Sequence, residues 1–254
     1  MRDIGREIQE NLDAIEARYN VTILLAVESG SRAWGFASPD SDYDVRFIYM
    51  QQPEEYLRID AAKDVIEWQL DEVLDINGWD LKKALLAFGK GNPNVMEWAN
   101  SPIIYRKADI WDELKAAAFR YFSEKSALCH YYGTANSTLH EYLMKETVRY
   151  KKYFYALRPL LAAIYIERYH CAPPVFFDDL LRMDLPDELR QAIDKLLTIK
   201  KLTTEAEELP HIPEIREFIQ TETAKQKETA AAMQDDRKKD FSALNEVFRR
   251  TIRK

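Results

Sequence analysis

Cysteine is scarce in this chain of 254 residues, where only Cys129 and Cys171 occur. They form no Cys-x-x-Cys pair, so the sequence encodes neither a disulfide framework nor a zinc knuckle. We expect both to be reduced thiols in the core. Long apolar runs are also absent, since Leu160 to Ile166 falls far short of the roughly 20 residues that span a bilayer. The sequence therefore predicts no membrane-embedded segment and no membrane partner.

Several recognition motifs are missing as well. The first ten residues lack the apolar segment and small-residue cleavage site of a secretory signal, which predicts a cytoplasmic protein. Neither GxGxxG nor GxxxxGK[ST] occurs, which excludes kinase-type and Walker phosphate loops. The four histidines are scattered and form no HExxH pair. A histidine-based metal site is therefore not predicted.

Charge is unevenly distributed along the chain. The formal net charge is −7, but residues 1–100 contribute −9 and the remainder +2. A general duplex-DNA binder would present a broad basic surface, and this sequence does not. The distribution is compatible with a metal site in the first part and a phosphate-binding cluster in the second.

Glycine is rare, and its placement divides the chain. Six of the seven glycines precede residue 92, which indicates strands and tight turns early and long helices later. Short apolar runs predict strands at 21–27, 44–50, 65–68 and 72–76. Helical periodicity predicts helices that include 110–129, 137–158, 159–170, 186–200, 213–234 and 239–252. We predict an α+β fold, with a small mixed sheet domain at 1–109 and an all-helical domain at 110–254.

The most informative stretch joins the first two predicted strands. Gly30 and Ser31 follow the first strand, where glycine allows a sharp turn whose N–H groups and hydroxyls can hold phosphate oxygens. Asp42 and Asp44 lie two residues apart at the start of the next strand, so an extended backbone would point both carboxylates to one face, roughly 6 to 7 Å apart. Such a pair can share one or two hard cations. The stretch therefore predicts a phosphate and divalent metal site.

This combination resembles the nucleotidyltransferase superfamily of DNA polymerase β. The shared features are Gly-Ser after a strand, a gap of eleven residues from Ser31 to Asp42, and Asp-x-Asp on the following strand. The segments GSRAWGFASPDSDYDVRFIY, DINGWDLKKAL, KGNPNVMEWANSPIIY and KKYFYALRPLLA look like a bacterial group of predicted nucleotidyltransferases, some linked with RNA-repair gene clusters. The resemblance covers about residues 22 to 180.

The resemblance implies a function and a set of roles. Gly30 and Ser31 would bind the phosphates of a nucleoside triphosphate, and Asp42 and Asp44 would hold Mg²⁺ or Mn²⁺, as two ions. The enzyme would transfer a nucleoside monophosphate to an acceptor hydroxyl and release pyrophosphate. For the acceptor, an RNA end, a small hydroxyl compound and a protein side chain are the alternatives.

A third carboxylate is expected from a later strand. Asp75 lies in an apolar run just before a turn and a helix, which is where the superfamily supplies this residue. Glu67 is the competitor, because an acid within an apolar strand also needs a reason to be buried. We favour Asp75, with metal binding and proton removal from the acceptor hydroxyl as its role.

A basic and aromatic cluster lies in the helical part. Lys151, Tyr155 and Arg158 share one helical face, and Lys152 lies beside them. We predict that these four residues bind the nucleotide, with the cations on the triphosphate and the ring against the base. The alternative is a surface helix with solvated cations and core aromatics. For the whole protein, the alternative is a non-catalytic regulatory or antitoxin-like nucleotide- or RNA-binding protein. The sequence does not define an oligomeric state.

Overall fold

The computed structural model describes residues 2–38, 41–60, 62–71, 73–202 and 208–253. The chain forms two compact units, of which the first comprises Met1–Ala33, Ser41–Phe122 and Arg237–Lys254. The second comprises Trp34–Asp40 and Ser123–Asp236. The division into functional domains at residue 109 stays a prediction.

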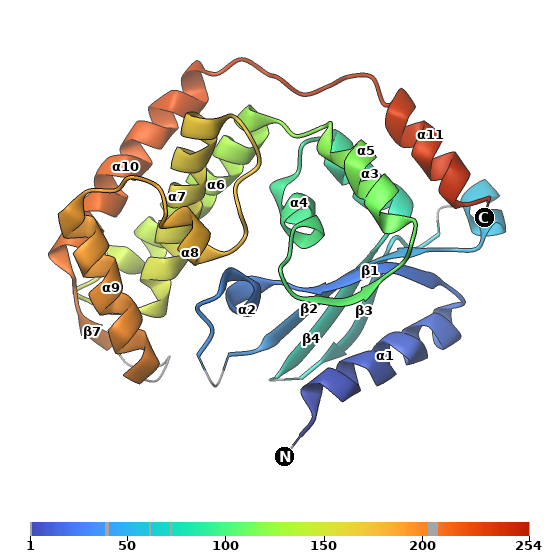
Figure 1. Cartoon of the computed structure of the whole chain (residues 1–254), viewed down its shortest axis with the longest axis horizontal. Coiled ribbons are helices and arrows are strands. Elements are labelled where there is room, and N and C mark those ends of the chain that lie inside the picture. The colour runs from blue at the N-terminus through green and yellow to red at the C-terminus, as the bar shows by residue number, and fades with distance from the viewer. Residues whose placement is uncertain (1, 39–40, 61, 72, 203–207, 254) are drawn as a thin grey trace. The chain divides into compact units, whose positions relative to one another are not determined.

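A mixed five-stranded sheet organises the first unit, in the order β3-β4-β2-β1-β5 (Figure 1). The strands are β1 (Thr22–Glu28), β2 (Tyr43–Met50), β3 (Val65–Leu70), β4 (Leu74–Asp80) and β5 (Ile104–Lys107). Only β2 and β4 pair in parallel, and the other neighbours are antiparallel. This arrangement confirms the predicted α+β class. The edge strand β5 was not predicted.

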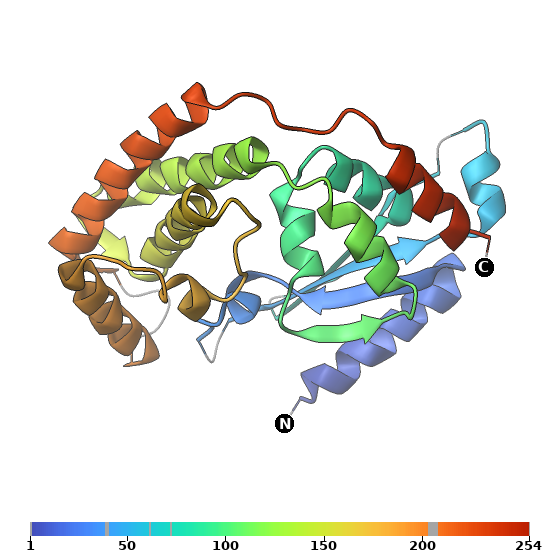
Figure 2. The same ribbon diagram turned by 45° about the horizontal axis from the view of Figure 1, so that its top comes forward.

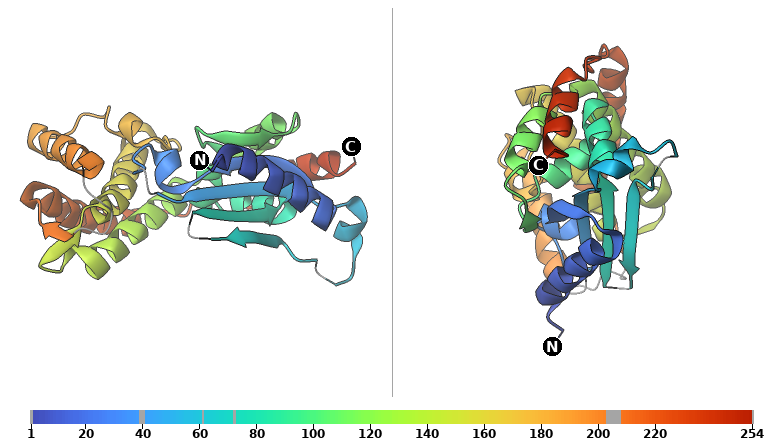
Figure 3. Two further views of the ribbon diagram at one scale, coloured as in Figure 1. Left: turned by 90° about the horizontal axis from the view of Figure 1, so that it is seen from below. Right: turned by 90° about the vertical axis from the view of Figure 1, so that its right-hand side faces the viewer.

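Helix α1 (Ile4–Tyr19) covers one face of this sheet (Figures 1 and 3). Asp3 caps the helix by accepting a hydrogen bond from the Arg6 N–H. Ile8, Leu12 and Ile15 recur at helical spacing and are fully buried against the sheet. This apolar stripe thus forms a hydrophobic core on that face of the sheet.

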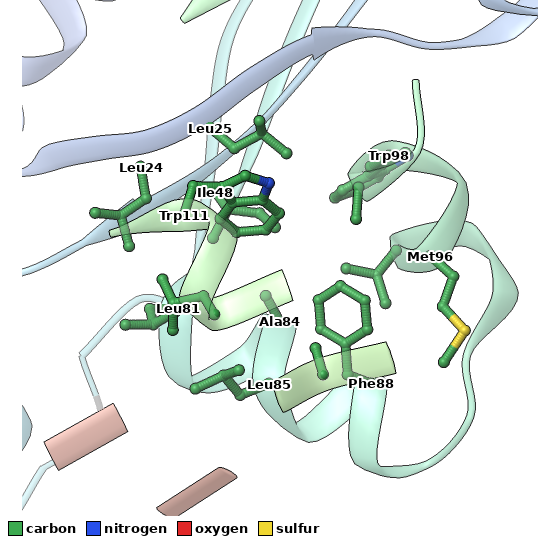
Figure 4. Packing of buried hydrophobic residues seen from close by; sticks show 14 of the residues in the cluster. Leu24, Leu25, Ile48, Leu81, Ala84, Leu85, Phe88, Met96, Trp98 and Trp111 are labelled. Atoms are coloured by element: carbon green, nitrogen blue, oxygen red, sulfur yellow. The ribbon is translucent and has the colours of Figure 1, made fainter. Parts of the chain in front are cut away.

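The opposite face of the sheet is covered by α3 (Leu81–Gly89), α4 (Pro93–Ala99), α5 (Trp111–Phe119) and α11 (Ser242–Thr251). Figure 4 shows Leu25 and Ile48 of the sheet facing the side chains of α3, with Trp98 and Trp111 beside them. Helix α11 comes from the end of the chain and packs with α3 and α5 (Figure 2). The first unit therefore includes a C-terminal helix.

The second unit is mainly helical. It contains α6 (Glu124–Thr138), a π-helical segment η2 (Leu139–Leu143), α7 (Lys151–Tyr169), α8 (Phe177–Leu180), α9 (Asp187–Leu202) and α10 (Pro213–Ala232). A small hairpin pairs β6 (Thr147–Arg149) with β7 (Glu208–Pro210). Phe36 stacks on Phe154 at 4.8 Å between ring centroids, so the segment after α2 (Gly30–Trp34) is part of this core.

Four local expectations were wrong. The predicted helix 110–129 is divided, because α5 ends at Phe119 and α6 begins at Glu124. The predicted helix 137–158 is divided, because the chain passes through η2 and β6 before α7 begins at Lys151. Helix α7 then continues through Pro159, where no break occurs. Cys129 and Cys171 are exposed rather than in the core. Among the described residues, no helix has the length and apolar character needed to cross a membrane.

Candidate active site

The turn after β1 is built around Gly30. Its φ is +61°, in the left-handed region that favours glycine. A Cβ placed on Gly30 would lie 2.1 Å from Oδ2 of Asp44, so the Asp44 carboxylate occupies the space beside the glycine. The Ser29 N–H also donates to the Asp44 carbonyl at 2.8 Å. The turn and the carboxylate are therefore fitted to each other.

Asp44 and Asp75 lie opposite each other on neighbouring parallel strands. The β2–β4 register pairs them directly, so both side chains leave the sheet on the same face. Their side chains are 33% and 32% exposed. Arg46 lies on the same face, and its Nη2 donates to Asp44 Oδ1 at 3.1 Å and to Asp75 Oδ2 at 2.7 Å. The two acids are thus bridged by one guanidinium.

The environment of Asp44 opposes its ionisation. Burial raises the pKa of the Asp44 carboxyl above its usual range, and the positive charge of Arg46 acts in the opposite direction. The negative charges of Asp75 and Asp42 raise the pKa further. Burial and the two neighbouring carboxylates together outweigh the effect of Arg46 on this pKa, and a bound cation would favour the ionised carboxylate.

Asp42 and Ser31 lie at the two ends of the connecting segment. Ser31 is the second residue of α2, and Asp42 immediately precedes β2 and is exposed. Arg32 holds the segment in place, because its Nε donates to the Asp42 carbonyl at 3.0 Å and its Nη2 to the Ser41 carbonyl at 2.6 Å. Its guanidinium also lies 3.6 Å from the Tyr43 ring centroid.

Glu28 holds the backbone of Asp44 in place through a hydrogen bond. It is fully buried at the end of β1, and its Oε1 accepts a hydrogen bond from the Asp44 N–H at 2.7 Å. Its Oε2 accepts a short hydrogen bond from the Tyr105 hydroxyl. Burial raises the pKa of the Glu28 carboxyl, whereas these two hydrogen bonds lower it.

The structure places the two candidates for the third carboxylate differently. Asp75 lies beside Asp44, as described. Glu67 on β3 pairs with Asn77 rather than with Asp75, and it is exposed at the rim of a cavity of about 710 Å³ that Tyr49 and Lys63 also line. Geometry therefore favours Asp75, and its role stays a prediction.

The carboxylates match the donor chemistry of a divalent site without forming one as they stand. Asp42, Asp44 and Asp75 offer the hard oxygen ligands that Mg²⁺ and Mn²⁺ prefer. Within the described ranges, however, no three His, Cys, Asp or Glu side chains converge closely enough to hold a metal ion. Arg46 lies between two of the three acids. Metal binding by Asp44 and Asp75 would require the Arg46 guanidinium to move away from them.

The predicted nucleotide-binding residues of the second unit all lie on α7. Lys151 and Lys152 are half-buried in its first turn, and Tyr155 is 38% exposed. Arg158 is buried, with its guanidinium carbon 4.6 Å from the Trp34 ring centroid and its Nε donating to the Val175 carbonyl at 3.3 Å. Arg158 thus has a packing role inside the unit.

Three residues that contact the site were not predicted. Glu28, an acid that ends an apolar strand, carries the same signal that drew attention to Glu67. Arg46 follows Asp44 by two residues, so strand alternation places both on one face. Arg32 directly follows Gly30-Ser31, and its sequence position gave no indication of the carbonyls that it contacts.

Comparison with known proteins gives a consistent identification. The family described as the RNA repair pathway DNA polymerase beta family, RlaP, matches residues 4–250. YcgL of Bacillus subtilis (strain 168), described as uncharacterized, is 39% identical over 249 residues, which cover 97% of this chain and 96% of that protein.

A solved structure of a nucleotidyltransferase-like protein from Exiguobacterium sibiricum 255-15 was also matched. The match covers 97% of this chain and 80% of the other, at 13% identity and a TM-score of 0.29. That score is too low to support a detailed comparison. The family match over nearly the whole chain, together with the resemblance at Gly30 and Asp44, is decisive: the chain belongs to the RNA repair pathway DNA polymerase beta family.

Proposed function

We propose that this protein transfers a nucleoside monophosphate from a nucleoside triphosphate to an acceptor hydroxyl. Family membership and the α+β fold support an enzyme of the polymerase β nucleotidyltransferase type. The observation that carries the proposal is the direct pairing of Asp44 with Asp75 beside the Gly30 turn. Two carboxylates beside a glycine turn are a suitable arrangement for a metal-assisted phosphoryl transfer.

Asp42, Asp44 and Asp75 would hold two Mg²⁺ or Mn²⁺ ions. When bound, such ions shield the triphosphate and lower the pKa of the attacking hydroxyl. The backbone of the Gly30 turn and the Ser31 hydroxyl would donate hydrogen bonds to phosphate oxygens. Glu28 and Arg32 would keep Asp44 and Asp42 in position through the contacts described above.

The bond changes follow from this placement. The acceptor oxygen attacks the α-phosphorus, and the bond from that phosphorus to the bridging oxygen of the leaving pyrophosphate breaks. The hydroxyl proton goes to a carboxylate oxygen of Asp75. Lys151 and Lys152 would offset phosphate charge, and Tyr155 would contact the base. Arg158 would act through Trp34, since it is buried against that ring.

The test is incubation of the protein with each α-labelled nucleoside triphosphate, Mg²⁺ or Mn²⁺, and separate RNA, protein and small-molecule fractions. We expect label to enter one fraction and to be lost with Asp44→Asn and Asp75→Asn while both variants remain folded by circular dichroism. Glu10→Gln, an exposed change on α1, is the control and should retain transfer. The labelled fraction identifies the acceptor class.

One observation favours a second candidate function, that of a non-catalytic regulatory or antitoxin-like binder. Arg46 donates hydrogen bonds to both Asp44 and Asp75, so the two carboxylates have a partner within the protein. Under this alternative no fraction gains label, and the Asp44→Asn variant still binds nucleotide or RNA.

A further inference from the structure

A cavity in the second unit is rich in positive charge. Its volume is about 320 Å³, at the small end of ligand pockets. The residues that define its character are Tyr142, Lys145, Arg149, Lys151, Lys152 and Glu208. The cations come from three places, namely the segment after η2, strand β6 and the first turn of α7.

Tyr142 gathers two of these cations at one ring. The Lys152 ammonium lies 3.7 Å from the ring centroid, and that of Lys145 lies 5.8 Å from it. Tyr142 belongs to η2, and π-helical turns of this kind often mark functional positions. Each ammonium is attracted to the ring, so Tyr142 keeps two positive charges at the cavity.

The cavity has more positive than negative charge. Glu208 is the one acid among its described lining residues, and it is engaged by Thr147, whose hydroxyl donates to it at 2.7 Å. Its other oxygen lies 3.9 Å from Arg149 Nε. Glu141 and Glu146 are neighbours in sequence but do not line the cavity. This local excess of positive charge contrasts with the net charge of −7 for the whole chain.

Buried contacts fix the wall of the cavity. His211 Nε2 donates to the Lys145 carbonyl at 2.8 Å, and its Nδ1 lies 2.7 Å from the hydroxyl of the buried Tyr153. Val148 is buried between the exposed Thr147 and Arg149, so strand alternation turns both of the latter outward. The charged groups are therefore mounted on an ordered frame, which lowers the entropy cost of binding.

We propose that Lys145 and Arg149 at this cavity bind the backbone phosphates of a single-stranded polynucleotide, which is the acceptor in the proposed transfer, while Lys151 and Lys152 keep their proposed contact with the triphosphate. The inference rests on that proposed function and names its acceptor class. A cavity that combines cations from three chain segments with an aromatic ring is typical of sites that bind a nucleic-acid strand. At about 320 Å³, the cavity can enclose only a short part of a longer chain.

The test is the affinity of the full chain for a fluorescent 12-nucleotide RNA, measured over a range of salt without metal or triphosphate. The main variant is Lys145→Gln with Arg149→Gln, two residues outside the set proposed for the triphosphate. We expect about tenfold weaker RNA binding and a salt slope smaller by about 1.4, because two phosphate contacts are lost. Glu208→Gln should tighten binding by about twofold, since it removes the opposing charge.

Lys195→Gln with Lys227→Gln, on α9 and α10, is the matched control, because it also removes two positive charges, from exposed residues that do not line the cavity. It should leave RNA affinity within about twofold of wild type. An equal loss in this control, or unchanged RNA binding in the double variant, overturns the inference.

Failure of this inference and failure of the proposed function are separable. RNA binding is measured without turnover, and Asp44→Asn should retain it. If the wild type transfers label while the double variant binds RNA normally, only the assignment of the cavity is wrong. If no label is transferred and RNA binding depends on Lys145 and Arg149, the proposed transfer reaction and the acceptor role are wrong. The assignment of the cavity as a phosphate-binding site is then still supported.

Discussion

The carboxylate of Glu28 accepts a hydrogen bond from the backbone N–H of Asp44, 2.7 Å away, from its position at the end of the neighbouring strand. The same carboxylate accepts the Tyr105 hydroxyl. Glu28→Ala would leave both donors without this acceptor, so we expect a loss of about 2 kcal/mol in the free energy of unfolding. Denaturant titration measures it. Tyr105→Phe removes only one donor and should cost less, and an equal or larger cost would contradict this account.

The same residue makes stability depend on pH. The folded state raises the pKa of Glu28, mainly through burial, so the native protein retains this proton to higher pH than the unfolded chain. The contribution of Glu28 to stability therefore falls as pH rises from the unfolded pKa of about 4.3 to the higher folded value, and is constant above it. Glu28→Gln does not titrate. The unfolding free energy of Glu28→Gln minus that of wild type should increase across this window, and a difference independent of pH would count against it.

Gly30 offers a test with an internal control. Gly30→Ala would place a methyl group 2.1 Å from Asp44 Oδ2 and force alanine to adopt a φ of +61°. We expect a loss of about 2 kcal/mol in stability and of about 100-fold in transfer, because Asp44 must move. Gly133→Ala on α6 meets no atom within 4 Å and should stabilise the fold by up to about 1 kcal/mol. Thermal melts and single-turnover transfer compare the two.

The third carboxylate can be assigned by two matched substitutions. Asp75→Asn removes a charge beside Asp44, and Glu67→Gln removes one from an exposed position opposite Asn77. We expect at least about a 100-fold loss of transfer for Asp75→Asn and less than about a twofold change for Glu67→Gln. The reverse order of effects would show that β3, rather than β4, supplies the acid.

Much of the sheet could be predicted because its strands are short apolar runs between polar turns. The run VTILLAV predicts β1 almost to the residue, and the start of β2 follows from the alternation around Val45. Asp75 could be placed near Asp44 only through the resemblance, since the parallel β2–β4 register is a tertiary property. Local periodicity carries no information on which strands become neighbours.

Other features could not be predicted from the sequence, for physical reasons that the structure shows. Strand β5 has four residues and lies at the sheet edge, so it shows no alternating pattern. The interval between η2 and α7 reads as helix by composition, but β6 is held there by pairing with β7, some 60 residues later in the chain. The bridge from Arg46 to Asp75 depends on the same long-range register as the acid pair itself.

Arg46 leads to the prediction that discriminates best between an enzyme and a binding protein. If Asp44 and Asp75 hold divalent ions, the guanidinium between them competes with the metal. Arg46→Gln should then bind Mn²⁺ about 5- to 10-fold more tightly than wild type in calorimetric titration without nucleotide, because one opposing positive charge is removed. Arg58→Gln makes the same charge change in the first unit, where Arg58 pairs with Glu55 and Asp60, and should not alter Mn²⁺ affinity. Equal Mn²⁺ affinity in wild type and Arg46→Gln would mean that Arg46 is a permanent partner of the two acids, which would exclude them as the metal ligands.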